Sequence, residues 1–166
     1  MAGLDIIIVN EREADAHAVS ILEERAFGPG RYARTAFRLR EGNHHDLSLS
    51  FIARVSTLIV GSIRLSHIMI GSHPALLLGP LTVDPAFRSK SIGKMLMEAA
   101  ITEAKIQSHR LIILVGDEAY YGRVGFKRAS TSRIIMPGPV DPMRLLALEL
   151  VEGAASNAKG AVHGGR

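Results

Sequence analysis

The amino-acid sequence predicts a mixed α/β fold in which antiparallel strands come first and a parallel strand–helix–strand crossover follows. Residues 47–55 and 58–70 both alternate apolar with polar side chains across a short polar connection, which is typical of an antiparallel hairpin. A helical pattern at 92–107 then separates the apolar strand 75–83 from the continuous apolar run 111–115. Such a run indicates a strand buried on both faces, and a crossover of this length favours parallel pairing.

The first part of the chain adds a strand and a helix to this plan. The β-branched residues 6–9 predict a strand, and apolar side chains within 13–27 recur at helical spacing. Glycine and proline at 28–30 end that helix. The irregular pattern of 31–40 is compatible with a second short helix, and 41–46 predicts a turn.

Gly79 and Pro80 interrupt the strand 75–83. Proline cannot donate a hydrogen bond to a neighbouring strand, so we expect a bulge or a splay at this point of a central strand. The helix 92–107 carries a polar stripe opposite its apolar residues, which predicts that it packs on the sheet. We expect 144–151 to form the last strand.

The length of the chain, 166 residues, fits one domain, which we place at 1–151. The following residues are small, polar and rich in glycine. Segments of this composition at a terminus are commonly disordered, so we expect 152–166 to be a disordered C-terminal tail.

Composition excludes several kinds of chemistry and partner. The absence of cysteine excludes disulfides, thiolate metal sites and a cysteine nucleophile. Lysine and arginine number 20 against 16 aspartate and glutamate, a net charge of +4 that suits an anionic ligand but is too small and too scattered for a nucleic-acid face. No apolar run approaches the roughly 20 residues that cross a bilayer, so we expect no membrane association. The acidic start of the chain is unlike an export signal, and we expect a cytoplasmic protein.

The segment 81–100, LTVDPAFRSKSIGKMLMEAA, carries the clearest chemical signal. A strand ends there, a short basic turn follows, and a long helix begins. Free N–H groups and the helix dipole make such a terminus a binding site for phosphate. Arg88, Lys90 and Lys94 add positive charge to this terminus. Gly93 allows a ligand to approach the backbone closely, and Ser89 or Ser91 can cap the helix. An ordinary capped helix with solvated basic residues is the alternative.

The residues Arg88 to Gly93 resemble the acyl-CoA-binding motif of the GNAT superfamily of N-acetyltransferases. The family pattern is Arg or Gln, two residues of any kind, Gly, any residue, and then Gly or Ala. The preceding LTVDP and the following amphipathic helix also match the family. Ser91 stands where the pattern has its first glycine, and its Cβ could crowd the pyrophosphate and lower the affinity for the cofactor.

A second segment, GDEAYYGRVGF at 116–126, is similar to the next motif of the family. In that motif a tyrosine lies five residues before the phenylalanine of a Gly-Phe pair, as Tyr121 lies before Phe126 here. With both motifs in order, the resemblance covers about 6–151. The combination resembles the small bacterial branch of predicted acetyltransferases of the YhbS type.

The resemblance implies an N-acetyltransferase that moves an acetyl group from acetyl-CoA to a primary amine by direct attack in a ternary complex. It implies Tyr121 as the acid that protonates the leaving thiolate, with packing against the last strand as the alternative role, and Tyr120 as a structural or cleft-lining residue. A homodimer is common in the family. The implied cofactor-binding residues are Leu81, Thr82, Val83, Arg88, Ser89, Lys90, Ser91, Ile92, Gly93 and Lys94.

The general base and the acceptor stay open at this point. Asp84, Asp117 and Glu118 follow the two motif strands, but a water relay could serve instead. The arginines of 31–38 could attract a carboxylate on a small-molecule or peptide amine, or could form a solvated helix face.

Other functions are also compatible with the sequence. The histidines, His44 and His45 in a loop and His67 and His73 six residues apart, have no carboxylate cluster nearby, so we expect no metal site, although His67 could face the acceptor. A CoA-binding module without catalytic activity, acting as a sensor or partner subunit, is the main alternative function. A nucleotide-binding protein fits less well because no Walker lysine pattern is present.

Overall fold

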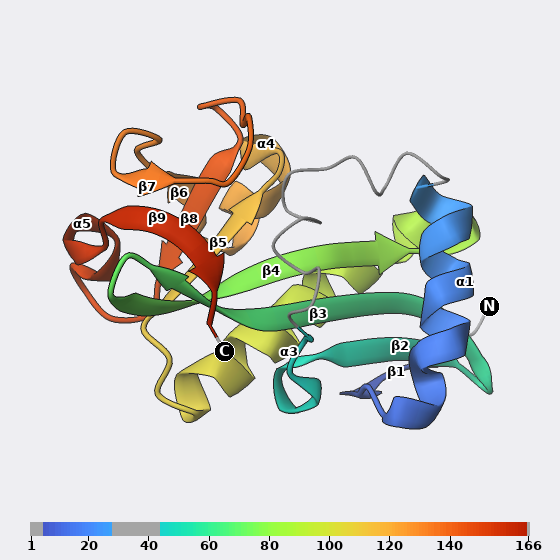
Figure 1. The fold of residues 1–166 in the computed structure, drawn as a ribbon. Helices are drawn as coiled ribbons and strands as arrows, with labels where there is room; N and C mark the ends of the chain where they lie inside the picture. The colour runs from blue at the N-terminus through green and yellow to red at the C-terminus, as the bar shows by residue number, and fades with distance from the viewer. Residues whose placement is uncertain (1–4, 28–43, 166) are drawn as a thin grey trace.

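The strands join a nine-stranded mixed sheet, in the order β1-β2-β3-β4-β5-β8-β6, with β9 pairing with β3 and β7 (Figure 1). The structure, a computed structural model, describes residues 5–27 and 44–165. The strands are β1 (Ile6–Asn10), β2 (Phe51–Val55), β3 (Leu58–Ile70), β4 (His73–Val83), β5 (Leu111–Val115), β6 (Lys127–Arg128), β7 (Ile134–Ile135), β8 (Leu145–Glu149) and β9 (Gly160–Gly164). The helices are α1 (Ala16–Phe27), α3 (Ile92–Ile106), α4 (Glu118–Tyr121) and α5 (Ala154–Asn157).

The predicted fold class is confirmed. β1 to β4 pair in antiparallel fashion, which includes the expected hairpin of β2 and β3. β4 and β5 are parallel, with Leu76 opposite Ile112, and α3 connects them. The hairpin begins later than expected, because Leu47–Leu49 forms a short 3-10 helix that Asp46 caps.

The expected bulge lies in β4. Ile63 of β3 faces Leu81 and Leu65 faces Leu78, so Gly79 and Pro80 together oppose the single residue Arg64. On its other edge β4 pairs with β5 only through Leu76 and Leu77. The carboxyl half of β4 is therefore splayed away from β5, as the sequence predicted.

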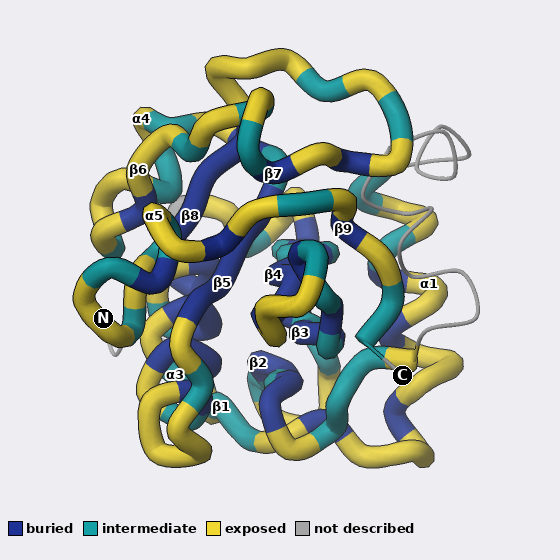
Figure 2. Tube along the Cα trace, turned by 60° about the vertical axis from the view of Figure 1, so that its left-hand side comes forward, coloured by how far each residue is buried: buried dark blue, intermediate teal, exposed yellow. Residues whose placement is uncertain are grey.

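The long helices α1 and α3 cover opposite faces of the sheet (Figures 1 and 2). α3 packs on β1 to β4, and a Cβ at Gly61 of β3 would touch its Ile92 and Leu96. The stripe of Lys94 and other polar residues on α3 faces solvent. α1 crosses β3 and β4 on the other face and buries Val19 there. The pattern of apolar residues thus predicted correctly which face of α3 packs.

The residues after 151 differ from the expected disordered tail. They form α5 and β9, and β9 pairs with the end of β3 (Ile70 with Val162) and with β7. Small apolar side chains four residues apart (Ala154, Ala158 and Val162) are buried in a second core with residues of β5 and β8. The last strand is therefore β9, not 144–151 as expected. Its glycines do not make the segment disordered; they allow its backbone to contact the β3–β4 turn closely.

Several expectations fall outside the described residues. The helix stop at 28–30, the second helix at 31–40 and its arginines are among them. Within 5–27 and 44–165, no helix combines the length and apolarity that crossing a bilayer requires.

Candidate functional site

A cleft of about 480 Å³ opens beside the splayed end of β4. One wall is the turn that precedes α3, a second is the end of α1 with Ala26 and Phe27, and a third is α4 with the turn after it. The predicted cofactor residues among its described lining are Leu81, Val83, Arg88, Ser91, Gly93 and Lys94. Tyr121, the predicted acid, lines the same cleft. Two segments about 30 residues apart in sequence thus meet at one site.

The other predicted cofactor residues lie elsewhere. The Thr82 side chain is buried and its hydroxyl has no hydrogen-bond partner, while its neighbours Leu81 and Val83 line the cleft, because successive residues of a strand point to opposite faces. Ile92 is fully buried in the core under α3. Lys90 is exposed outside the cleft, and the side chain of Ser89 is not among those the structure describes. For Thr82 and Ile92 only the backbone remains available as a cofactor contact.

Ser91 connects the 3-10 turn Pro85–Lys90 to α3 in a left-handed conformation, with φ 59° and ψ 21°. Ser91, one of the two serines expected as a cap, occupies the N-cap position of α3, but its side chain makes no capping hydrogen bond. A left-handed residue is ordinarily glycine, because a Cβ is strained there. This conformation gives a physical reason for the glycine in the family pattern.

The amino end of α3 has the properties of an anion-binding site. The side chain of the N-cap residue Ser91 does not cap its first N–H groups, and its first turn holds no acidic residue. Arg88 and Lys94 are exposed, and neither forms an ion pair with any residue that the structure describes. The partial positive charge of the helix end and two unpaired cations therefore point into one cleft.

The two tyrosines of α4 occupy different places in the cleft. The Tyr121 ring lies against Gly116, where a Cβ would collide with it, and contacts Phe126 edge-on at a centroid distance of 6.0 Å. The Tyr120 hydroxyl lies directly over Gly93. Tyr120 therefore reaches the amino end of α3, whereas Tyr121 packs toward β5.

The three carboxylates considered as a base all have other partners. Asp84 is buried, pairs with Arg25 at 2.9 Å and accepts a hydrogen bond from the N–H of Ala86. Asp117 caps α4 through the N–H of Ala119, and Glu118 pairs with Arg128 at 3.2 Å. None of the three is among the described lining of the cleft.

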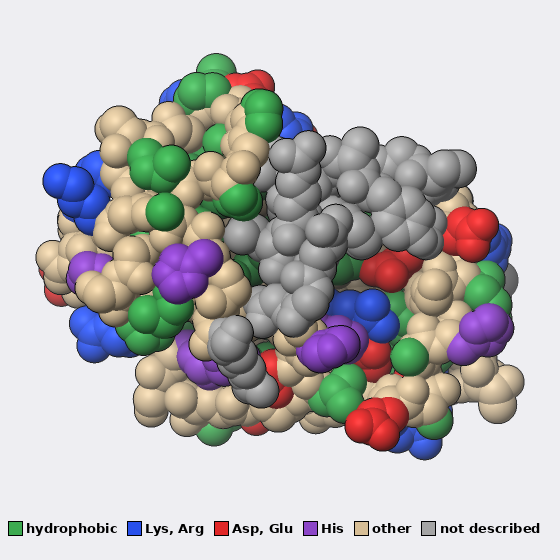
Figure 3. Space-filling view, viewed as in Figure 1, with side chains coloured by type: hydrophobic (Ala, Val, Ile, Leu, Met, Phe, Trp, Pro, Cys, Tyr) green, Lys and Arg blue, Asp and Glu red, His purple; other side chains and the backbone are tan. Residues whose placement is uncertain are grey.

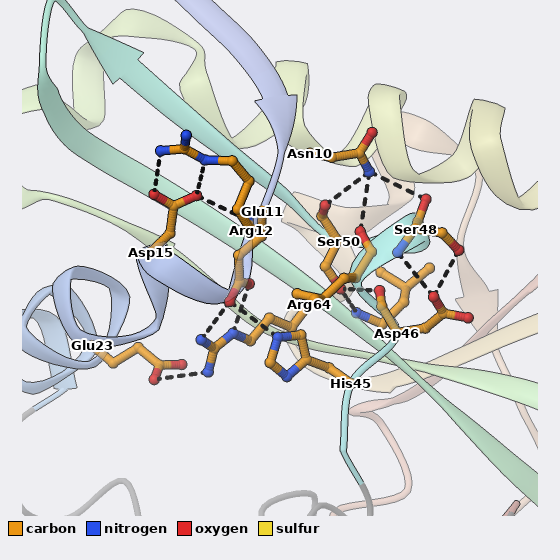
Figure 4. A network of polar contacts seen from close by, with 12 residues as sticks. Asn10, Glu11, Arg12, Asp15, Glu23, His45, Asp46, Ser48, Ser50 and Arg64 are labelled. Atoms are coloured by element: carbon orange, nitrogen blue, oxygen red, sulfur yellow. Dashed lines mark hydrogen bonds and ion pairs between the residues drawn. The ribbon is translucent and has the colours of Figure 1, made fainter.

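The α1 wall is held by a buried network that sequence reasoning missed (Figure 4). Arg64, opposite the bulge, donates two hydrogen bonds to Glu11, at 3.0 and 2.9 Å, and lies 3.6 Å from Glu23 of α1. His45 contacts the same Glu11 carboxylate at 3.1 Å. These four residues are 12 to 53 positions apart in sequence, so local patterns gave no signal of the contact.

The network also changes the acidity of Glu11. Burial by itself would raise the pKa of this carboxyl. The hydrogen bonds from His45 and Arg64, together with their charges, outweigh burial and hold the pKa of Glu11 below its ordinary value of 4.5. Glu11 is thus a carboxylate at neutral pH with a structural role.

Two other histidines, His67 and His109, lie together near Asp46. His67 contacts Asp46 at 2.7 Å, and its ring lies 5.3 Å from that of His109. The described residues contain no group of three or more His, Asp or Glu side chains arranged to hold a metal ion.

On the described part of the face in Figure 3, Lys and Arg side chains are separated from one another and interspersed with acidic ones.

Comparison with known proteins shows the family. Residues 46–128, half of the chain, match the model of the acetyltransferase (GNAT) domain. The uncharacterised N-acetyltransferase YjhQ of Escherichia coli strain K12 is 27% identical over 119 residues, which cover 69% of this chain and 66% of that protein. The chain therefore spans just under two thirds of the length of this relative.

Solved structures agree with this result. The GNAT family N-acetyltransferase YhbS of Escherichia coli, solved in complex with CoA, superposes with a TM-score of 0.83 at 21% identity, covering 100% of this chain and 98% of YhbS. A GNAT family acetyltransferase of Brucella melitensis, solved with acetyl-CoA, has a TM-score of 0.65 at 28% identity, covering 88% of this chain and 97% of that one. The resemblance noted in the sequence is confirmed.

Proposed function

Because the chain belongs to the GNAT acetyltransferase family, we propose that it transfers an acetyl group from acetyl-CoA to a primary amine. The observation that carries the proposal is the shared cleft, in which the turn before α3 and Tyr121 face the splayed end of β4. The relatives solved with CoA and with acetyl-CoA support the choice of cofactor.

The proposed binding mode uses the geometry of the cleft. The free N–H groups at the start of α3, with Arg88 and Lys94, bind the pyrophosphate. The backbone of Leu81 to Val83, which has no strand partner on the β5 side, offers hydrogen bonds to the amide groups of the pantetheine arm. The thioester of acetyl-CoA then lies near the point where β4 diverges from β5.

The proposed reaction proceeds in a ternary complex without an enzyme-bound intermediate. The neutral amine attacks the carbonyl carbon of the thioester, and the carbon–sulfur bond breaks as the tetrahedral intermediate collapses. The Tyr121 hydroxyl gives its proton to the departing thiolate. Water accepts the proton of the amine, since Asp84, Asp117 and Glu118 are engaged elsewhere.

Calorimetric titration with acetyl-CoA, CoA and ATP, followed by a free-thiol assay on a panel of small amines and peptides, tests the proposal. We expect both CoA species to bind and ATP not to bind. Tyr121→Phe should lower kcat by about 10² while the Kd for acetyl-CoA stays constant. Unchanged turnover in Tyr121→Phe would remove the acid assignment, and absence of CoA binding would refute the function.

A CoA-binding module without catalytic activity is the second candidate. It is favoured by the engagement of all three nearby carboxylates and by serine at position 91. This alternative predicts saturable CoA binding with no thiol release for any amine in the panel. Thiol release with a single amine is enough to reject it.

A further inference from the structure

The cleft wall opposite the α3 turn carries a cation that is not part of the acyl-CoA-binding motif at Arg88 to Gly93. Arg123 lies in the 3-10 turn Gly122–Val124 after α4, is exposed, and lines the cleft. It forms no ion pair with a carboxylate among the residues that the structure describes. An uncompensated cation facing a cleft indicates an anionic ligand.

The Arg123 guanidinium is held in a defined place. Its carbon lies 4.6 Å from the centroid of the Tyr120 ring, and its Nε donates a hydrogen bond to the Tyr120 carbonyl at 3.2 Å. Stacking on an aromatic ring and a fixed Nε orient the guanidinium, so less side-chain entropy is lost when it binds a ligand. The terminal nitrogens of the fork have no hydrogen-bond partner among the described residues.

Tyr120 connects this cation to the opposite wall. Its hydroxyl lies over Gly93, at the amino end of α3, while Arg123 lies over its ring. A ligand with phosphate at the α3 end therefore passes beside Tyr120 and comes within reach of Arg123. CoA carries phosphate in two places, the pyrophosphate and the 3′-phosphate of its ribose.

We propose that Arg123, stacked on Tyr120, binds a phosphate group of the cofactor from the wall opposite the α3 turn. The proposal rests on the proposed use of acetyl-CoA and adds to it a second phosphate contact outside the acyl-CoA-binding motif at Arg88 to Gly93. Arg123 is the binding residue, and Tyr120 is the positioning residue that orients it. The guanidinium fork matches phosphate oxygens in a two-bond geometry that a lysine cannot make.

Titration calorimetry with CoA, 3′-dephospho-CoA and pantetheine tests the proposal. We expect Arg123→Ala to weaken CoA binding about 10-fold, the scale of a hydrogen bond to a charged group. A loss with CoA alone identifies the 3′-phosphate, and a loss with both CoA and 3′-dephospho-CoA identifies the pyrophosphate. An equal loss with pantetheine, which has no phosphate, would overturn the proposal.

Arg128→Ala is the matched control. Arg128 is also exposed and basic and follows α4, but it pairs with Glu118 and is not among the described lining of the cleft. Its removal should leave the Kd for CoA unchanged, and an effect as large as that of Arg123→Ala would also overturn the proposal. If the unmodified protein binds no CoA, the proposed function itself fails, which is a different result.

The role of Tyr120 is tested by a double-mutant cycle. Tyr120→Leu removes the ring on which Arg123 stacks, and we expect it to weaken CoA binding. If Tyr120 acts through Arg123, the double variant binds CoA no more weakly than the weaker-binding single variant. Additive losses in the Kd would refute the positioning role. Circular dichroism of each variant checks that the fold is intact.

Discussion

Charged residues on the α1 face of the sheet and those around the cleft are used in opposite ways. On the α1 face, buried Glu11 and half-buried Arg64 satisfy each other. Around the cleft, Arg88, Lys94 and Arg123 are exposed and have no carboxylate partner among the described residues. The first set holds elements together, and the second is free to bind an anion.

The physical costs of the two arrangements differ. Breaking a buried ion pair leaves an uncompensated charge in a medium of low polarity, whereas an exposed cation keeps its water and costs little. The comparison therefore predicts that removing charge on the α1 face changes stability, while removing charge at the cleft changes ligand affinity.

The largest expected effect is on the buried pair. Arg64→Leu leaves the Glu11 carboxylate buried without its main partner and should lower the free energy of unfolding by about 3 kcal/mol. Urea unfolding followed by circular dichroism measures it. Arg88→Ala, the control at the cleft, should change stability by less than about 0.5 kcal/mol. Similar losses in both variants would break the comparison.

The pH dependence of stability sharpens the same point. The pKa of Glu11 is lowered in the folded state, so its contribution to stability is complete above the unfolded value of 4.5 and is lost as the pH falls through the folded pKa. The free energy of unfolding should therefore fall more steeply below pH 4.5 in the unmodified protein than in Glu11→Gln. Subtracting the two curves removes the contributions of Asp15 and Asp46, whose pKa values are also lowered. Parallel curves would contradict the assignment.

An intermediate effect is expected where the two regions meet. Arg25 of α1 pairs with buried Asp84, which also holds the start of the turn that carries Arg88. Arg25→Ala should lower stability by about 1 kcal/mol and raise the Kd for CoA, because the turn loses its connection to the α1 wall.

Arg12→Ala is the matched control for that experiment. The side chains of Arg12 and Asp15 are 65% and 7% exposed, close to the 58% and 4% of Arg25 and Asp84, but this pair does not touch the cleft. Its loss should leave the Kd for CoA unchanged. If both variants weaken CoA binding equally, the Arg25–Asp84 pair has no special relation to the cleft.

The smallest effect is expected at Ser91. Replacing it by glycine relieves a left-handed strain of about 1 kcal/mol but adds freedom to the unfolded chain, for a net gain of roughly 0.5 kcal/mol. Removal of the Cβ should also tighten CoA binding. Ser91→Ala keeps the Cβ and should show neither gain, and a gain in that variant would contradict the explanation.

Local patterns predicted the parts of the fold that are local in sequence. The hairpin of β2 and β3, the parallel crossover through α3 and the bulge at Gly79 and Pro80 all follow from residues close to one another. β9 was missed because its partner, the end of β3, lies more than 90 residues earlier. A glycine-rich composition does not reveal that three small apolar residues will be buried.

The candidate site shows the same limit. The turn before α3 and Tyr121 were found because each belongs to a short motif. The α1 wall, the Arg64 network and the contact of Tyr120 with Gly93 depend on long-range packing, which no spacing encodes. Arg123 had a usable signal, since it lies two residues after Tyr121 on the same turn, but only the structure shows that it faces the cleft.

The position of β9 beside β3 has a consequence for synthesis of the chain. Ile68 and Ile70 are synthesised more than 90 residues before their pairing partners in 162–164. The hairpin formed by β3 and β4 therefore emerges with an apolar end that its own neighbours in sequence cannot cover. Nascent chains of this kind are exposed to aggregation until β9 arrives, so the sheet is completed only after residues 162–164 have left the ribosome.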